Sequence, residues 1–415
     1  MVTLKFREST TQSAPIALPG SKSMAARALI LNALSDRQCR LVGIPHCEDT
    51  DALRHALETV AEDKTATINV GGAGTAMRFI TALAAATPDV HILLTGSERM
   101  TKRPIGPLVD ALRQAGADIE YQRHDDYPPL LIKGTPLKGD NVEIRADVSS
   151  QFISALMMIA PTIDGGLAIH RKGARTVSRP YIDMTASMMR QFGAHIDQNG
   201  TDIIVHGGKY QAPDEYVIEP DWSAASYFYE IAALLNGKEV AIENLLPPEK
   251  SLQGDARCAQ LFSNLGVSTE YLPDGTAVLR GGGQTRIADE DLSQTPDLVP
   301  ALAVAHCLCG VPFRFKGIDH LRLKESNRLD VIVAELRKLG FVASEHDDVL
   351  EWSGEICSAK SDEPIRTHDD HRIAMAFAPA VYKFKELVIL HEGVVDKSYP
   401  LYWSNLEKLG IRIYL

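Results

Sequence analysis

The feature that most constrains the fold is a pattern that recurs at intervals of 70 to 77 residues. Each copy has an apolar helix end, a glycine, a short strand, a turn and a second strand that ends near another glycine. The glycines after the helices stand at positions 116, 193, 266, 340 and 410. Glycine suits a point where a helix ends and a strand begins, because it adopts left-handed backbone angles without steric cost.

Extrapolated toward the N-terminus, the same interval places a further copy near residues 60–66. Residues 53–60 have the pattern of its helix, but the stretch that follows is too short for two strands, so we expect a trimmed copy. A repeat of this length is too large for a simple solenoid. With 415 residues the chain also exceeds the size of a single core. Six copies therefore predict an α/β protein in which three repeats build each of two similar domains.

The bulk composition excludes several classes of protein. The formal net charge is −11, which argues against nucleic acid as a partner. The longest apolar stretch, residues 298–309, is too short to span a bilayer, so we expect no membrane association. The N-terminus does not show the regions of a signal peptide, and we therefore expect a cytoplasmic protein.

The six cysteines include no CxxC pair and no histidine at zinc spacing. Cys307 and Cys309 could form a metal half-site, but they follow an apolar helical run. Buried thiols in a reducing cytosol are the favoured interpretation. The sequence thus predicts neither a metal nor another cofactor.

Discrete basic motifs stand out against the acidic background. They are residues 20–23 with Arg27, residues 99–104, residues 324–328 and residues 369–372. Arginine binds carboxylate and phosphate groups bidentately. This pattern indicates one compact site for a small, highly anionic ligand.

Nearly all of these motifs, and several serine or glycine motifs, stand at predicted helix starts. Residues 18–23 precede a helical run, residues 71–78 form a glycine-rich loop that opens a helix, and Ser149-Ser150 and Ser178 precede two more. The exposed N–H groups and the dipole of a helix N-terminus favour an anion. Each motif alone is equally consistent with an ordinary helix cap. If the helices of each domain are parallel, however, their positive ends converge on one cleft.

Two further motifs carry candidate acid–base groups. Lys324 and Arg328 are four residues apart, which predicts a shared helix face with Glu325 beside them. Like charges at this spacing repel unless an anion lies between them. Asp297 stands just before a helix, where it can cap the helix or accept a proton from a hydroxyl.

Taken in order, the motifs resemble those of the 5-enolpyruvylshikimate-3-phosphate synthases, a family of enolpyruvyl transferases. The resemblance extends over essentially the whole chain and rests on residues 18–27, 73–78, 103–106, 149–152, 178–183, 296–297, 324–328 and 370–375. It implies a two-domain inside-out α/β barrel, in which each domain has three βαβαββ-type repeats around a pseudo-threefold axis. Residues 1–18 and 219–415 then form a discontinuous C-terminal domain, residues 19–218 form the N-terminal domain, and the active site lies in the cleft between them.

The resemblance also implies a reaction between phosphoenolpyruvate and 3-phosphoshikimate in the shikimate pathway, which leads to chorismate and the aromatic amino acids. The 5-hydroxyl adds to C2 of phosphoenolpyruvate while C3 gains a proton, and the tetrahedral intermediate then loses phosphate. Each substrate carries a phosphate and a carboxylate, which accounts for the discrete cations. Closure of the domains would exclude water. We expect these two substrates as the only partners and a monomeric enzyme without a cofactor.

The residues that match the family's motifs divide by implied role. Those implied for 3-phosphoshikimate are Lys22, Ser23, Arg27, Ser149, Ser150, Gln151, Ser178, Tyr181, Asp297 and Lys324. Those implied for phosphoenolpyruvate are Lys22, Gly74, Arg103, Gln151, Arg328, Arg372 and Lys397. Those implied for catalysis are Asp297, Glu325, Lys22 and Lys324. The resemblance makes Asp297 the base for the hydroxyl and Glu325 the proton donor to C3, but it leaves the individual proton transfers among Asp297, Glu325 and Lys324 open.

Three positions depart from the family pattern. Gly72 and His320 each stand where asparagine is common, and Phe79 stands where proline is usual. These departures leave one contact to each substrate unassigned.

Two other functions stay open. A sister enolpyruvyl transferase acts on UDP-N-acetylglucosamine and uses a loop cysteine as an acid, but residues 94–103 contain no cysteine. A binding protein on the same scaffold could have lost catalysis, although the chain keeps Lys22, Asp297, Glu325 and Arg328 together.

Overall fold

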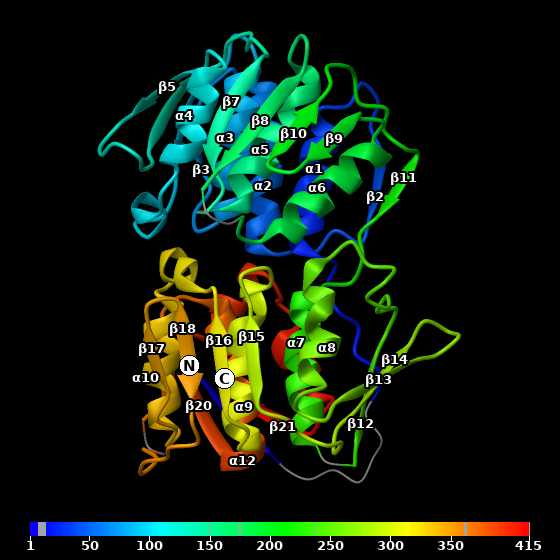
Figure 1. The fold of residues 1–415 in the computed structure, drawn as a ribbon, viewed down its shortest axis with the longest axis vertical. Helices are drawn as coiled ribbons and strands as arrows, with labels where there is room; N and C mark the ends of the chain where they lie inside the picture. The colour runs from blue at the N-terminus through cyan, green and yellow to red at the C-terminus, as the bar shows by residue number, and fades with distance from the viewer. Residues whose placement is uncertain (7–13, 148, 174–175, 236, 361–362, 415) are drawn as a thin grey trace. The chain divides into compact units, whose positions relative to one another are not determined.

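The computed structural model describes residues 1–6, 14–147, 149–173, 176–235, 237–360 and 363–414. The chain forms two compact units. We name them the central unit, Lys22–Ile218, and the terminal unit, which combines Met1–Ser21 with Glu219–Leu415. In Figure 1 the central unit runs from blue to green, and the long part of the terminal unit runs from green to red.

The first boundary falls after Ser21 rather than after position 18, where the sequence predicts it. The reason is a pair of backbone hydrogen bonds between the two segments that enter the terminal unit. Ser21 N–H donates to the Glu219 carbonyl at 2.7 Å, and Asp221 N–H donates to the Pro19 carbonyl at 2.9 Å. These bonds tie the residues just before Lys22 to the terminal unit.

The described residues of the central unit form two four-stranded sheets and one two-stranded sheet, with strand orders β3-β4-β6-β5, β7-β8-β10-β9 and β11-β2. The helices are α1 (Lys22–Ala33), α2 (Glu48–Glu62), α3 (Gly74–Ala86), η1 (Met100–Lys102), α4 (Gly106–Gln114), α5 (Ser150–Ile159), η2 (Ala160–Thr162) and α6 (Arg179–Gln191). The strands are β2 (Arg40–Val42), β3 (Thr65–Asn69), β4 (His91–Thr95), β5 (Asp118–Tyr121), β6 (Leu130–Lys133), β7 (Asn141–Arg145), β8 (Leu167–Lys172), β9 (Ile196–Asn199), β10 (Asp202–Val205) and β11 (Glu215–Val217).

The four-stranded sheets share one topology. In the first, β3 and β4 are parallel and are connected by α3, and β6 then pairs antiparallel with both β4 and β5. The second repeats this arrangement with α5 between β7 and β8. The predicted βαβαββ repeat is therefore confirmed, including its two-strand ending after a helix and a glycine.

The predicted trimming of the first repeat is confirmed as well. Its sheet, as far as the structure describes the chain, has only β2 and β11, which pair in parallel. No hairpin intervenes between α2, which ends at Glu62, and β3, which begins at Thr65. The partner strand β11 is the last strand of the central unit in the sequence. The two strands of this sheet therefore pair although they are far apart in the chain.

The terminal unit has one three-stranded and two four-stranded sheets, with orders β12-β14-β13, β15-β16-β18-β17 and β19-β20-β1-β21. Its helices are α7 (Trp222–Leu234), η3 (Gly254–Arg257), α8 (Cys258–Phe262), η4 (Pro296–Leu298), α9 (Val299–Cys309), η5 (Asp319–Leu323), α10 (Arg328–Lys338), α11 (His371–Phe377), η6 (Ala378–Ala380), α12 (Val381–Phe384), η7 (Glu392–Lys397) and α13 (Tyr402–Glu407). Its strands are β1 (Val2–Phe6), β12 (Glu239–Ile242), β13 (Ser268–Tyr271), β14 (Ala277–Arg280), β15 (Ala288–Asp291), β16 (Phe313–Lys316), β17 (Ser344–His346), β18 (Val349–Trp352), β19 (Ile365–Arg366), β20 (Glu386–Leu390) and β21 (Ile411–Tyr414).

The first residues of the chain complete the sheets of the terminal unit. Strand β1 lies between β20 and β21 and pairs antiparallel with both. It holds the place that β18 holds in the preceding repeat. Farther along, Ile16 forms a parallel bridge with Ile242 of β12. In sequence order the last repeat lacks the strand between β20 and β21. Strand β1, from the N-terminus, supplies it.

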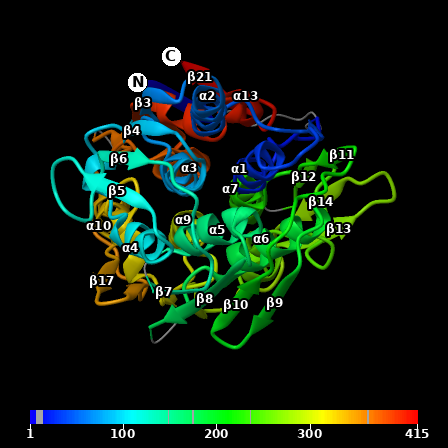
Figure 2. The same ribbon diagram turned by 90° about the horizontal axis from the view of Figure 1, so that it is seen from above.

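In five of the six repeats, as far as the structure describes them, one helix is almost wholly buried and the sheet lies outside it, which is the inside-out arrangement. Nearly all residues of α3, α5, α7, α9 and α11 are buried. Figure 2 shows α3 and α5 inside the central unit, with the sheets of β5–β6 and β8–β10 farther out. Helices α4, α6 and α10 bury one face only. Burial of each large apolar side chain contributes about 1.5–3 kcal/mol, so the inner helices hold each unit together.

Four of the six cysteines, Cys39, Cys47, Cys258 and Cys307, are buried free thiols, as predicted. The prediction is wrong for Cys357, which is exposed in the loop after β18, and Cys309 is only half-buried at the end of α9. Among the described helices, none is long and apolar enough to cross a membrane.

Glu230 is an exception inside the apolar core. It lies in the middle of α7 with no exposed surface, and neither carboxyl oxygen has a hydrogen-bond partner among the described residues. Burial raises the pKa of this carboxyl well above its ordinary value of 4.5. The core therefore holds Glu230 in its neutral form.

We expect Glu230→Gln to stabilise the terminal unit at alkaline pH. Above pH 4.5 the unfolded chain ionises this residue while the folded chain keeps it protonated, so the stability of the native protein falls as the pH rises. Glutamine has no proton to lose. The free energy of unfolding of the variant should exceed that of the native protein at pH 8 by at least about 1 kcal/mol, and by less at pH 5.

Urea unfolding followed by tryptophan fluorescence measures this difference, because all three tryptophans lie in the terminal unit. Glu407→Gln on the exposed face of α13 is the control and should show no such dependence. An equal effect of Glu230→Gln at both pH values would contradict the expectation.

Candidate functional site

Lys22 is the first residue of α1 and contacts the start of a second helix. Its Nζ lies 2.6 Å from Asp49 Oδ2, in the first turn of α2. Both side chains are largely buried, at 16% and 7% exposure. Ser23 follows at the second position of α1 and is half-buried. The pair holds the ammonium group at the helix start, where the dipole adds positive potential.

Arg27 lies one turn farther along α1 and is 2% exposed. Its Nε donates to Thr185 Oγ1 at 2.6 Å, and its Nη2 donates to Ser154 Oγ at 3.1 Å and to the Tyr181 carbonyl at 3.3 Å. Its Nη1 donates to the Ser23 carbonyl at 2.8 Å. Burial lowers the pKa of Arg27 to about 10. The guanidinium thus joins α1, α5 and α6, and most of its donors are engaged by the protein.

Phe79, one of the departures from the family pattern, packs against this arginine. The Arg27 Cζ lies 5.6 Å from the Phe79 ring centre and 5.9 Å from that of Tyr181. The phenylalanine is 1% exposed. The two rings supply cation–π contacts to a charge that has lost its water.

The glycine-rich loop brings Gly74 against Arg103. A Cβ added to Gly74 would lie 2.7 Å from Nη1 and 3.0 Å from Nη2 of Arg103, so only glycine lets this guanidinium rest on the start of α3. Arg103 stands three residues before α4 and is 8% exposed. Arg78 supports the arrangement from inside, because its Nη1 donates to the Gly74 carbonyl at 3.0 Å and its Nη2 to the Pro104 carbonyl at 3.1 Å.

The start of α5 contacts the start of α3. Gln151 Nε2 donates to Thr75 Oγ1 at 3.0 Å. Ser149 is the N-cap of α5, and its hydroxyl accepts from the Gln151 N–H at 3.3 Å. Ser150 is the first helical residue and is 6% exposed. Two hydroxyls and an amide therefore stand at one helix N-terminus, as predicted.

Ser178 has left-handed backbone angles at the N-cap of α6, with φ of 53°. Such a conformation costs a non-glycine residue of order 1 kcal/mol or more and often marks a functional position. Tyr181, in the first turn, is half-buried, and its carbonyl receives the hydrogen bond from Arg27. Helix α1 contacts α2 and α6, and α3 contacts α5 and the loop before α4. These contacts bring the helix starts together at one end of the central unit.

In the terminal unit the organising residue is Arg328, at the first position of α10 and 1% exposed. Its Nε donates to Asp370 Oδ2 at 2.8 Å. Its Nη1 donates to Asp297 Oδ1 at 3.1 Å, and its Nη2 donates to Glu325 Oε2 at 2.8 Å. Burial would lower the pKa of Arg328, but Asp370, Glu325 and Asp297 outweigh burial and raise it. One guanidinium thus joins three carboxylates from three helix starts.

Asp297 lies in η4, just before α9, between two arginines. Arg372, the second residue of α11, donates from Nη2 to Asp297 Oδ2 at 2.7 Å. Burial alone would raise the pKa of the Asp297 carboxyl. The charges of Arg372, Lys324 and Arg328 outweigh burial and hold this pKa well below its usual range. Asp297 is therefore ionised in this network.

The expected shared helix face of Lys324 and Arg328 is wrong. Lys324 follows η5, whereas α10 begins only at Arg328. The intervening Ser326 is held away from a helical turn, because its hydroxyl donates to Asp370 Oδ2 at 3.0 Å. Lys324 nevertheless lies near Asp297, since it lowers the pKa of that carboxyl.

The two remaining predicted residues of the terminal unit also meet. Lys397, at the end of η7, places Nζ 3.9 Å from Glu325 Oε1. Both side chains are largely buried, at 11% and 13% exposure. Asp297, Lys324, Glu325, Arg328, Arg372 and Lys397 therefore form one charged network within the terminal unit.

Four residues that support these groups had no predicted role, although two of them, Arg78 and Asp370, lie in motifs that the sequence picks out: Asp49, Arg78, Asp370 and Asp255. Asp370 has no exposed surface and accepts from Arg328, Ser326 and the Arg372 N–H. Asp255 is 2% exposed, and the Ser223 hydroxyl donates to its Oδ2. Each of the four stands at or near a helix start, but local sequence does not show which distant charge it meets.

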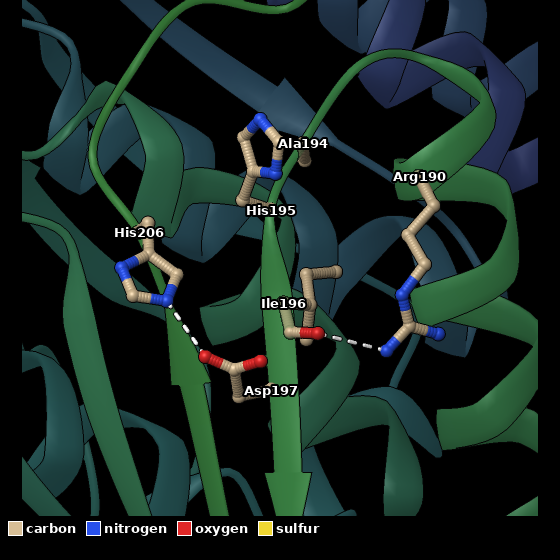
Figure 3. A pocket seen from close by; sticks show the side chains of 6 residues that line it. All are labelled: Arg190, Ala194, His195, Ile196, Asp197 and His206. Carbon is tan, nitrogen blue, oxygen red and sulfur yellow. Dashed lines mark hydrogen bonds and ion pairs between the residues drawn. The ribbon is translucent and has the colours of Figure 1, made fainter.

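A separate surface hollow lies at the hairpin of β9 and β10 in the central unit (Figure 3). Its volume is about 560 Å³, and its lining residues are Arg190, Ala194, His195, Ile196, Asp197 and His206. The His206 ring lies 2.8 Å from Asp197, and Arg190 Nη2 donates to the Ile196 carbonyl at 2.9 Å. None of the predicted site residues lines this hollow. Within the described part of the chain, no group of three or more His, Cys, Asp or Glu side chains is arranged to hold a metal ion.

Comparison with known proteins gives consistent similarities. Residues 6–67 and 55–406 match the sequence profile of the family described as EPSP synthase (3-phosphoshikimate 1-carboxyvinyltransferase). A 3-phosphoshikimate 1-carboxyvinyltransferase from Bacteroides fragilis strain YCH46 is 42% identical over 402 residues, which cover 96% of each chain. One from Vibrio atlanticus strain LGP32 is 35% identical over 428 residues, which cover 96% of this chain and 97% of its own. The solved structure of EPSP synthase from Acinetobacter baumannii has the same fold, with a TM-score of 0.75 and 21% identity over the full length of both chains.

We expect Asp370→Asn to destabilise the terminal unit by about 3 kcal/mol, because it removes the fully buried member of the three carboxylates that compensate the charge of Arg328. Urea unfolding monitored by tryptophan fluorescence measures the loss. Glu363→Gln is a suitable control, since it breaks an exposed ion pair with Lys360, at 44% and 61% exposure. That change should cost less than about 1 kcal/mol. Equal losses in the two variants would show that the buried network contributes no more than a surface pair.

Proposed function

This chain belongs to the EPSP synthase family, and we propose that it transfers the enolpyruvyl group of phosphoenolpyruvate to the 5-hydroxyl of 3-phosphoshikimate with release of phosphate. The observation that carries the proposal is the placement of the matching residues. In each unit they stand at helix starts and contact one another, with cations, hydroxyls and carboxylates side by side. Substrates with a phosphate and a carboxylate each require such a set of donors.

The central unit supplies the groups suited to phosphate. We assign the phosphate of 3-phosphoshikimate to Ser149, Ser150 and Ser178, with Tyr181 beside them, and the rest of this substrate to Lys22, Ser23 and Arg27 as well as Asp297 and Lys324. The strained N-cap and the buried hydroxyls support this assignment. Because four hydrogen bonds of Arg27 are made within the protein, its main contribution is to set the positions of α1, α5 and α6 around the ligand.

The phosphate of phosphoenolpyruvate is assigned to Arg103, Gln151 and Lys397, with the Gly74 backbone and Lys22 beside it. The closeness of Arg103 to Gly74 supports this, since a guanidinium over a helix N-terminus adds its charge to the dipole. The carboxylate of the same substrate is assigned to Arg328 and Arg372. Their planar guanidinium groups suit bidentate binding of a carboxylate.

The terminal unit supplies the proton transfers. Asp297 accepts the proton of the 5-hydroxyl as the oxygen bonds to C2 of phosphoenolpyruvate, and Glu325 gives a proton to C3. The C2–O bond to phosphate then breaks, phosphate leaves with the proton that Asp297 accepted, and C3 returns a proton to Glu325. Lys324 stands near Asp297 and stabilises its charge.

Substrate binding itself would make Asp297 a stronger base. Its pKa is held low mainly by the charge of Arg372, with Lys324 and Arg328 adding to it, against the opposing effect of burial. A substrate carboxylate on the two arginines neutralises part of that charge. The pKa of Asp297 then rises toward the range in which a carboxylate can take a proton from a hydroxyl.

We further propose that the protein acts in the cytoplasm as a monomer without a cofactor. The free thiols suit a reducing compartment. Every step of the proposed reaction is a proton transfer or a bond exchange at carbon, and amino-acid side chains suffice for both.

A turnover assay tests the function. Phosphate should be released from phosphoenolpyruvate only when 3-phosphoshikimate is present. Phosphate release with UDP-N-acetylglucosamine instead would identify the sister transferase. Binding of phosphoenolpyruvate and 3-phosphoshikimate without phosphate release would identify a binding protein that has lost catalysis.

We expect Lys22→Met to lower kcat/KM by about a hundredfold or more, because a charge-assisted contact to both substrates is lost. The folded state should persist, as judged by circular dichroism. Lys102→Met is the matched control, since Lys102 is 63% exposed and pairs with Glu98 on the surface. A kcat/KM for Lys22→Met within a factor of about three of the control would remove Lys22 from the proposed site.

A further inference from the structure

Helix α10 holds the chain segment before α11 at two points. Arg328, at the start of α10, donates from Nε to Asp370 Oδ2 at 2.8 Å. Glu335 lies about two turns farther along, on the same face of the helix. Its Oε2 accepts a hydrogen bond from the Arg366 N–H at 3.0 Å, and its Oε1 lies 3.1 Å from Nε2 of the His368 ring. The segment from Arg366 to Asp370 is therefore tied to α10 at both ends.

Between these two points the chain makes a turn with unusual backbone angles. The Asp370 N–H donates to the Thr367 carbonyl at 2.9 Å, which closes the turn. Both central residues, His368 and Asp369, have left-handed angles, with φ of 51° and 57°. Positive φ at both central positions is typical of a type I′ turn. Glycine adopts these angles without steric cost, but other residues hold them only where the surrounding structure supports the turn.

The turn determines the positions of two groups of the candidate site. Asp370 is the N-cap of α11, and its Oδ1 accepts from the Arg372 N–H at 3.0 Å. Arg372 lies in the first turn of this helix and donates from Nη2 to Asp297 Oδ2 at 2.7 Å. Because the type I′ turn leads directly into the N-cap, a change in its backbone angles would move the first turn of α11 and the guanidinium of Arg372 with it.

The carboxylate of Glu335 is itself held in place. Glu335 is 1% exposed. Lys338, in the last turn of α10, places Nζ 2.6 Å from Glu335 Oε2 and also donates to the Pro364 carbonyl at 3.0 Å. Hydrogen bonds to an ionised group are stronger than those between neutral groups. Glu335 is therefore a rigid acceptor for the segment that enters the turn.

We propose that Glu335 is a positioning residue for phosphoenolpyruvate. Through the Arg366 N–H and the His368 ring it holds the type I′ turn, and the turn places Arg372 to receive the carboxylate of this substrate. Glu335 acts through these groups and does not touch the reacting atoms. The inference rests on the proposed function and adds to it a residue that lies outside the matched motifs.

The test is Glu335→Ala, assayed for phosphate release with each substrate varied in turn while the other is saturating. The KM for phosphoenolpyruvate should rise about tenfold, because Arg372 no longer stands where the carboxylate binds, whereas the KM for 3-phosphoshikimate should change by less than about threefold. A merely structural role would reduce the amount of active enzyme, which lowers kcat and leaves both KM values unchanged. Glu363→Ala is the matched control, because Glu363 pairs with Lys360 on the surface before β19, and it should keep both native KM values.

A second substitution in the turn gives a reading that lost packing would not produce. Glycine adopts left-handed angles without steric cost, so a turn with Asp369→Gly needs less support from Glu335. When Asp369→Gly is added to Glu335→Ala, the KM for phosphoenolpyruvate should fall by at least about threefold from that of Glu335→Ala alone.

His368→Asn tests the other contact of the same carboxylate. Asparagine tolerates left-handed angles but removes the ring from Glu335. The KM for phosphoenolpyruvate should rise by about threefold, because one of the two contacts that hold the turn is lost. This variant decides the question even if Glu335→Ala does not fold, since the His368 side chain is 39% exposed.

The inference is overturned if Glu335→Ala lowers kcat alone, or if it raises both KM values by the same factor. It is also overturned if Asp369→Gly brings no recovery, or if His368→Asn keeps the native KM for phosphoenolpyruvate. Failure of the proposed function would look different, because the native enzyme would then release no phosphate from phosphoenolpyruvate and 3-phosphoshikimate.

Discussion

The inner helix of each repeat can leave water only by packing against the inner helices of neighbouring repeats and against the sheet outside it. The glycine-terminated hairpins supply that sheet, and the apolar residues of α3, α5, α7, α9 and α11 supply the core. Once these helices are packed, the positions of their first turns are determined. Polar residues at those first turns are then brought together by burial of the residues that follow them.

The same packing creates an electrostatic problem that the two units solve differently. In the terminal unit, Arg328 and Arg372 lose water and are compensated by Asp297, Asp370 and Glu325. In the central unit, Arg27 is compensated by neutral acceptors and by the faces of two aromatic rings. A cation held by neutral groups keeps its charge for an anion, whereas a cation held by carboxylates must exchange partners when an anion binds. In the proposed reaction, substrate binding to Arg328 and Arg372 would therefore change the ionisation of protein groups in the terminal unit, where the proposed acid–base residues Asp297 and Glu325 lie.

Much of the fold was predictable because its repeat is local. The glycines that end the helices, the hairpins that follow and the trimmed first copy are all properties of short segments, and each is confirmed. The closing partners were not predictable from the residues alone. Strand β1 completes the sheet of β20 and β21, and β11 pairs with β2, across separations of 175 residues or more. Short strands carry no pattern that selects one distant partner, and only packing of the whole unit selects it.

The candidate site divides in the same way. The sequence by itself determined which residues are candidates for the site, because cations, hydroxyls and glycines at helix starts have recognisable local patterns. It did not determine that α10 begins only at Arg328, or that Asp370 compensates this arginine. These helix positions and ion pairs decide which carboxyl groups are ionised and which guanidinium groups can exchange a carboxylate of the protein for one of a ligand. They depend on distances between groups far apart in the chain and on the loss of water around them, and both quantities exist only in the folded structure.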